Sequence, residues 1–91
     1  MATSEAEVQT AVRGGHALFE RMLANLEIRI RDERRRLAVL EASVRKAESQ
    51  PTRSPALIEQ LKQSIATLQS QIDEDQMSLA DIRIESEMFC T

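Results

Sequence analysis

The chain has 91 residues, enough for one small domain, and two aromatic residues, too few for a sheet-rich protein. Charged residues make up 30 % of it, which is typical of long amphipathic helices. The net charge of -3 disfavours a dedicated nucleic-acid binder, and a single cysteine, Cys90, excludes an intrachain disulfide framework. The first ten residues lack the basic and apolar regions of a secretory signal, and no apolar run approaches the roughly 20 residues of a membrane span, so we expect a cytoplasmic protein.

Residues 1–15 are predicted to form a short or frayed helical arm. Ser4 followed by Glu7 fits a capping box, in which the side chain of each residue accepts a hydrogen bond from the other's backbone N–H. Gly14 and Gly15 come next, and each glycine costs about 1 kcal/mol in a helix interior. We therefore expect a hinge at the two glycines, and a continuous helix through them is the alternative.

Residues 16–91 are predicted to form a helical hairpin. Pro51 interrupts the first helix, and Ser54 with Pro55 begins the second, with serine as N-cap and proline at the first helical position. Because the loop is short, the two helices should pack antiparallel. The expected bounds are a helix over about 16–49, a loop over about 50–54 and a helix over about 55–89.

Both predicted helices carry a heptad repeat with apolar residues at positions a and d, which is typical of a coiled coil. In the first helix these positions hold His16, Phe19, Leu23, Leu26, Ile30, Glu33, Leu37, Leu40, Val44 and Ala47. In the second they hold Ile58, Leu61, Ile65, Leu68, Ile72, Asp75, Leu79, Ile82, Ser86 and Phe89. The predicted fold class is therefore all-α, an antiparallel two-helix coiled-coil hairpin.

The apolar positions set the register between the helices, with Ala47 opposite Ile58. This register places Glu27 opposite Arg83, Glu48 opposite Lys62, Arg34 by Gln76, Arg36 by Gln71 and His16 facing Phe89. It also places the arginine run of residues 29–36 alongside residues 69–76, which include Asp73, Glu74 and Asp75. The run is thus predicted to pair with carboxylates of the same chain or of another subunit.

Glu33 and Asp75 are the charged residues in the apolar stripe. One interpretation places them at the edge of the helix interface, where they reach solvent or neighbouring arginines such as Arg29 and Arg34. The other makes them a specificity device that fixes the register or the oligomeric state. An arginine should be close in either case, because a buried carboxylate without a partner is costly.

A two-helix hairpin has a thin core, so we expect a homodimer in which two hairpins form a four-helix bundle. Apolar residues outside the stripe gather toward the end of the hairpin that holds the chain termini, which is typical of a contact surface. A different protein bound to that surface is the alternative to self-association. The predicted protein-interaction surface consists of Leu18, Phe19, Met22, Ile28, Ile84, Met88 and Phe89.

The sequence contains no convincing reaction centre, so we expect a non-enzymatic protein without a metal or other cofactor. His16, Glu20 and Cys90 lie near one another in the predicted register, but they lack the close ligand spacing of zinc sites. Cys90 is more simply read as an exposed free thiol.

The leading functional hypothesis is a helical protein-interaction module: an adaptor, assembly factor, small chaperone or regulatory subunit. A second hypothesis is RNA or DNA binding by a dimeric four-helix bundle, through the outward-facing side chains of Arg31, Arg35, Arg45 and Lys46. A third is a subunit of a larger filamentous or secretion-type assembly.

Overall fold

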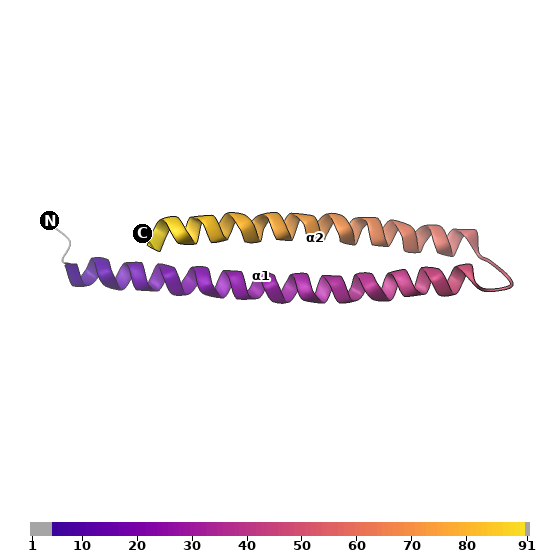
Figure 1. Cartoon of the computed structure of the whole chain (residues 1–91), viewed down its shortest axis with the longest axis horizontal. Helices are drawn as coiled ribbons and strands as arrows, with labels where there is room; N and C mark the ends of the chain where they lie inside the picture. The colour runs from indigo at the N-terminus through magenta and orange to yellow at the C-terminus, as the bar shows by residue number, and fades with distance from the viewer. Residues whose placement is uncertain (1–4, 91) are drawn as a thin grey trace.

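The fold is an antiparallel hairpin of two long helices, α1 (Glu5–Glu48) and α2 (Pro55–Cys90). The computed structural model describes the backbone of residues 5–90 and the side chains of residues 14–89. The helices lie side by side along their length, and α1 extends past the end of α2 (Figure 1). The predicted all-α hairpin is confirmed. Below, the end with the termini is called the open end, and the end with the connecting loop the closed end.

The hairpin is a rod of 75 × 18 × 14 Å. Its radius of gyration is 21.1 Å, whereas a compact domain of this length would have about 12 Å. A rod of two helices has one contact layer, so each helix leaves most of its circumference exposed.

Helix α1 is continuous through Gly14 and Gly15, so the expected hinge is absent and the alternative, an unbroken helix, is the one observed. Neither glycine has a positive φ. The capping box was expected at Ser4 and Glu7, whose side chains lie outside the described residues.

Side chains satisfy the backbone groups at the C-terminus of α1. Arg45 and Lys46 lie in its last turn, as expected, where cations interact favourably with the helix dipole. The Ser49 hydroxyl donates to the Lys46 carbonyl at 2.8 Å. The Arg53 Nε donates to the Glu48 carbonyl at 2.9 Å, so the loop supplies a cation to the negative end of α1.

The predicted N-cap of α2 is also present. The backbone N–H of Leu57 donates to the Ser54 hydroxyl at 3.4 Å, which satisfies one of the free amides of the first turn. Pro55 is the first helical residue, where its missing N–H carries no penalty.

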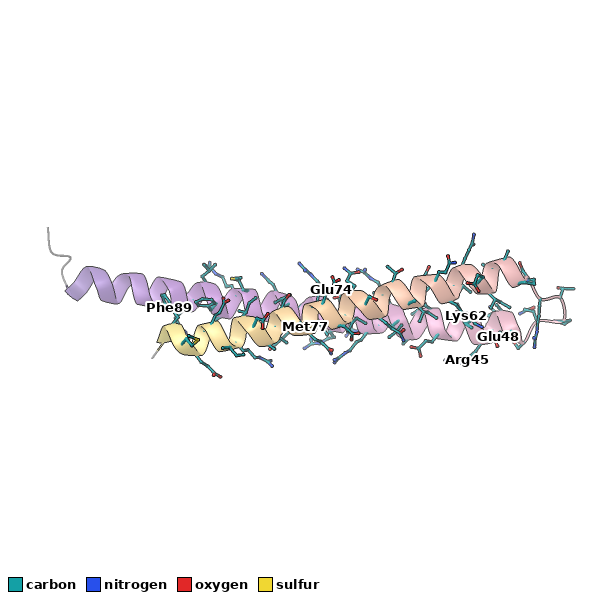
Figure 2. The ribbon with its side chains drawn as sticks, turned by 90° about the horizontal axis from the view of Figure 1, so that it is seen from above. Arg45, Glu48, Lys62, Glu74, Met77 and Phe89 are labelled. Atoms are coloured by element: carbon teal, nitrogen blue, oxygen red, sulfur yellow. The ribbon has the colours of Figure 1, made fainter. Side chains whose placement is uncertain are left out.

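The core is the row of a and d side chains between the helices, hereafter the seam. The buried apolar members among the described side chains are Ile30, Val44, Leu68 and Ile72, all at predicted a or d positions. The charged groups around the seam support the predicted register: Arg83 Nη2 lies 3.0 Å from Glu27 Oε1, as expected. Glu48 and Lys62 are labelled near the closed end in Figure 2, but the ion pairs between described side chains do not include them. Neither described helix has a stretch long and apolar enough to cross a membrane.

Candidate functional site

At the open end, two aromatic rings and a glycine pack against one another. The Phe19 and Phe89 rings pack with centroids 5.6 Å apart and planes tilted by 59°. The Phe89 ring also lies over Gly15: a Cβ added there would come within 2.5 Å of ring atoms Cε1 and Cζ, whereas one added at Gly14 would meet nothing within 4 Å. Gly15 therefore serves a packing role that the sequence analysis missed, because only the structure shows which side chain crosses it.

His16 was expected to face Phe89 and to lie near Cys90. Its Nε2 atom lies 2.9 Å from Glu20 Oε1, one turn along the same helix, on the exposed side of α1. The Cys90 side chain lies outside the described residues. Among the residues that the structure describes, no group of three or more His, Cys, Asp or Glu side chains could hold a metal ion.

The predicted interaction surface is largely exposed apolar area. Phe19 is half-buried because it packs against Phe89, and it thus belongs to the seam. The other members are exposed by 39–72 %: Leu18, Met22, Ile28, Ile84, Met88 and Phe89. Met77 is likewise exposed near the middle of the rod (Figure 2).

Two further exposed apolar residues lie nearer the closed end than Met77, Val39 at 65 % and Leu57 at 49 % exposure. Val39, Leu40 and Leu68 line a hollow of about 390 Å³, which Arg35 and Arg36 also border. The apolar surface therefore extends further toward the closed end than the sequence analysis predicted.

Glu33 is the most deeply buried charged residue described, with 2 % of its surface exposed. Neither of its carboxylate oxygens has a hydrogen-bond partner, and neither does Asp75 Oδ2. Asp75 Oδ1 lies 3.8 Å from Arg29 Nη1, so the expected arginine partner is present for Asp75. The interface-edge interpretation thus fits Asp75, but not Glu33.

The environment of Glu33 favours its protonated form. Burial is the main cause, and the nearby Asp75 carboxylate adds to it, because it repels a second negative charge and would accept a hydrogen bond from a protonated Glu33. Arg29 and Arg36 act in the opposite direction. The balance raises the pKa of Glu33 from 4.5 to about 7.

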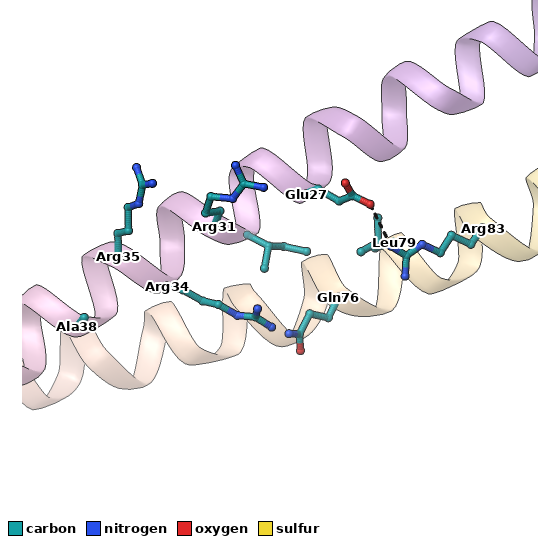
Figure 3. Close-up of a pocket in the computed structure, with 9 residues that line it drawn as sticks. Glu27, Arg31, Arg34, Arg35, Ala38, Gln76, Leu79 and Arg83 are labelled. Carbon is teal, nitrogen blue, oxygen red and sulfur yellow. Dashed lines mark hydrogen bonds and ion pairs between the residues drawn. The ribbon is translucent and has the colours of Figure 1, made fainter.

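Most arginines of the run form no ion pair with the side chains that the structure describes. Of residues 29–36, Arg29 forms an ion pair with α2, whereas the ion pairs of the described side chains include neither Arg31 nor Arg35. The side chains of these two arginines point away from α2 (Figure 3). Within the described residues, the predicted intrachain pairing with α2 is therefore observed for Arg29, and pairing of the other arginines with another subunit stays a prediction.

The same arginines surround a hollow of about 540 Å³ on one face of the hairpin (Figure 3). Its apolar lining residues are Ile30, Ala38 and Leu79. Five charged residues also line it, four cations and one carboxylate: Arg31, Arg34, Arg35, Arg83 and Glu27. The Glu27 carboxylate forms an ion pair with Arg83. The hollow thus has an excess of positive charge in a chain whose net charge is negative.

Comparison with protein-family models, with curated proteins and with solved structures finds no match for this chain.

Proposed function

We propose that the chain is a non-enzymatic helical protein-interaction module that self-associates into a four-helix bundle and presents apolar surface at its open end. The observation that carries this proposal is the small core. Among the described side chains, four apolar ones are buried in a rod 75 Å long, whereas nine large apolar ones are exposed. Chains with so little buried apolar surface usually need a partner or a covalent staple to be stable.

Self-association is tested by measuring absolute mass with light scattering after size exclusion, across a range of concentrations and with reductant present. A stable dimer mass supports the proposal. A monomeric chain with a fully helical circular dichroism spectrum would contradict it, since the hairpin would then be stable with its faces uncovered.

The apolar surface supports a chaperone-like or adaptor role, because an apolar patch on a rod can hold apolar segments of another protein. The methionines Met22 and Met88 suit an adaptable contact, since their side chains are flexible. Reduced insulin provides a test: its separated B chain aggregates, and the wild-type chain should delay that aggregation. The variant Met22→Lys/Ile84→Lys/Met88→Lys should lose the effect.

A matched control is Gln63→Lys/Ser70→Lys, which adds cations at exposed positions of α2 that carry no apolar side chain. It should delay aggregation as well as the wild type does. Equal loss of activity in both variants would contradict the surface assignment, because added charge alone would then explain the result.

Nucleic-acid binding is the second candidate, and the arginine-lined hollow is the observation that favours it. The net charge of -3 opposes it, and so does the small number of aromatic residues for base stacking, since the chain has only two and they pack against each other. Retention of a single-stranded RNA at low salt, weakening steeply as salt is added, would support this second function. The absence of retention at low salt would remove it.

A further inference from the structure

We propose that two copies of the hairpin pair in parallel, with their open ends together, through the face that carries the arginine-lined hollow, so that α1 of each copy lies against α2 of the other. This inference rests on the proposed self-association and specifies its geometry. In this arrangement, a second copy of this chain packs against the face that carries the hollow.

The face is defined by the side chains that line the hollow. Residues three or four positions apart lie on the same side of a helix. The face therefore includes the residues of α1 at this spacing from Arg34, and the residues of α2 at this spacing from Gln76 and Arg83. The outermost row on α1 consists of Ala17, Ala24, Arg31, Ala38 and Arg45, and all are exposed. The outermost row on α2 consists of Glu59, Ala66, Asp73, Ala80 and Glu87, and all are exposed.

These two rows carry opposite charges. The charged residues of the α1 row are both arginines, and those of the α2 row are all acidic. The difference extends to the whole of α2, which has seven acidic and two basic residues. A contact between two α1 rows would bring only arginines and alanines together, whereas a contact of the α1 row with the α2 row would bring arginines to carboxylates.

The register of the hairpin decides whether these charges meet. Arg29 contacts Asp75, and the helices are antiparallel, so Arg31 lies at the level of Asp73 along the rod. By the same count, Ala38 lies at the level of Ala66, and Ala24 at the level of Ala80. Arg45 lies at the level of Glu59. Arginine therefore matches a carboxylate, and alanine matches alanine, at four successive levels.

A two-fold axis along the rod preserves these levels and sets α1 of one copy over α2 of the other. It brings Arg31 to Asp73 of the second copy and Arg45 to Glu59 of the second copy, each pair occurring twice by symmetry. The alanines between them allow the helices to approach closely. A two-fold axis across the rod would instead set α1 over α1 and α2 over α2, without opposite charges in the outer rows.

The opposite face of the hairpin is less suited to this pairing. Asp32 and Glu74 lie on it at nearly the same level, so the same symmetry would bring acidic side chains together. Leu18, Met22 and Met88 also lie outside the proposed contact, so the second copy does not cover them.

Charge reversal tests the pairing. The variant Arg31→Glu/Arg45→Glu makes both outer rows acidic, and Glu59→Lys/Asp73→Lys makes both basic. Each variant alone should dimerise more weakly, with a dissociation constant raised about tenfold or more, since four ion pairs become repulsive. An equimolar mixture should recover the dimer mass, because every contact between unlike variants is attractive. Circular dichroism of each variant alone confirms that it remains helical.

Single cysteines test the geometry directly in a Cys90→Ser background. Oxidising a mixture of Ala38→Cys and Ala66→Cys chains should give mainly the mixed disulfide dimer, and Ala24→Cys with Ala80→Cys should do the same. Predominant disulfides between identical variants, or between Ala24→Cys and Ala38→Cys, would overturn the parallel arrangement.

The outcomes separate this inference from the proposed function. A wild-type monomer in light scattering would overturn both. A wild-type dimer whose mass and stability are unchanged in Arg31→Glu/Arg45→Glu would overturn the pairing alone and leave self-association intact. If this variant dimerises normally but no longer retains single-stranded RNA, the pairing is also overturned, and the arginines are assigned to nucleic-acid binding.

Discussion

The ring of Phe89 lies against the Cα of Gly15, so the last turns of α2 are fitted onto a glycine inside α1. Two adjacent glycines of one helix therefore have different environments, since Gly14 faces open space. The pair permits a comparison of helix propensity with packing at neighbouring positions.

Gly14→Ala should stabilise the hairpin by about 0.5–1 kcal/mol, because alanine reduces the conformational freedom of the unfolded chain and nothing opposes its methyl group. Gly15→Ala should fail to stabilise it and should displace the Phe89 ring. Urea unfolding at one protein concentration measures both effects. In a Phe89→Ala background the two glycine substitutions should become equivalent, and a persistent difference would show that the ring is not the cause.

Glu33 should make the stability of the hairpin depend on pH. Because its pKa is raised from 4.5 to about 7 in the folded state, the folded chain binds more protons than the unfolded chain between these values. Stability should therefore fall as the pH rises through this range, by up to about 1.4 kcal/mol per pH unit. The loss of stability should be complete at pH values above the pKa of Glu33 in the folded state.

Glu33→Gln should remove most of this dependence, since glutamine stays neutral. Glu33→Leu should raise stability above pH 7 by about 1–4 kcal/mol, as apolar replacements of buried charges often do. Thermal unfolding monitored at several pH values measures both variants. Asp32→Asn, which changes the exposed neighbour, is the control and should keep the wild-type slope. A flat wild-type profile between pH 4.5 and 7 would contradict the assignment to Glu33.

The backbone arrangement was predictable because heptad periodicity and loop chemistry are local signals. The burial of Ile30 and Ile72 follows from their a positions, and the start of α2 follows from Ser54 and Pro55. Burial of Glu33 was not predictable in the same way. Whether a carboxylate at position d turns to solvent or stays in the seam depends on the three-dimensional placement of its neighbours.

The partners of the arginines were also beyond the reach of the sequence. Register places residues at the same level along the rod, but it does not say on which side of the helix a long side chain extends. Arg29 reaches Asp75, while Arg31 and Arg35 extend away from α2 (Figure 3). The partners of such long side chains can therefore be identified only from the three-dimensional structure.

Ser54→Ala should destabilise the hairpin by about 1 kcal/mol, because the N–H of Leu57 would lose its hydroxyl partner. Ser64→Ala is the matched control: Ser64 is exposed within α2, where alanine has the higher helix propensity. Urea unfolding of the two variants should therefore show opposite signs. A loss of stability in both would show that the change reflects a general effect of removing a hydroxyl.

Ile28→Lys/Ile84→Lys should leave the dimer intact while reducing its apolar surface. Both isoleucines are more than half exposed, and both occupy the heptad position furthest from the other helix of the hairpin. In the parallel pairing through the arginine-lined face they remain outside the bundle. Light scattering should therefore report an unchanged mass, while the fluorescence of bound 8-anilinonaphthalene-1-sulfonate falls. A monomeric variant that remains helical would place these isoleucines in the contact between copies, and the face chosen from the charges would then be the wrong one.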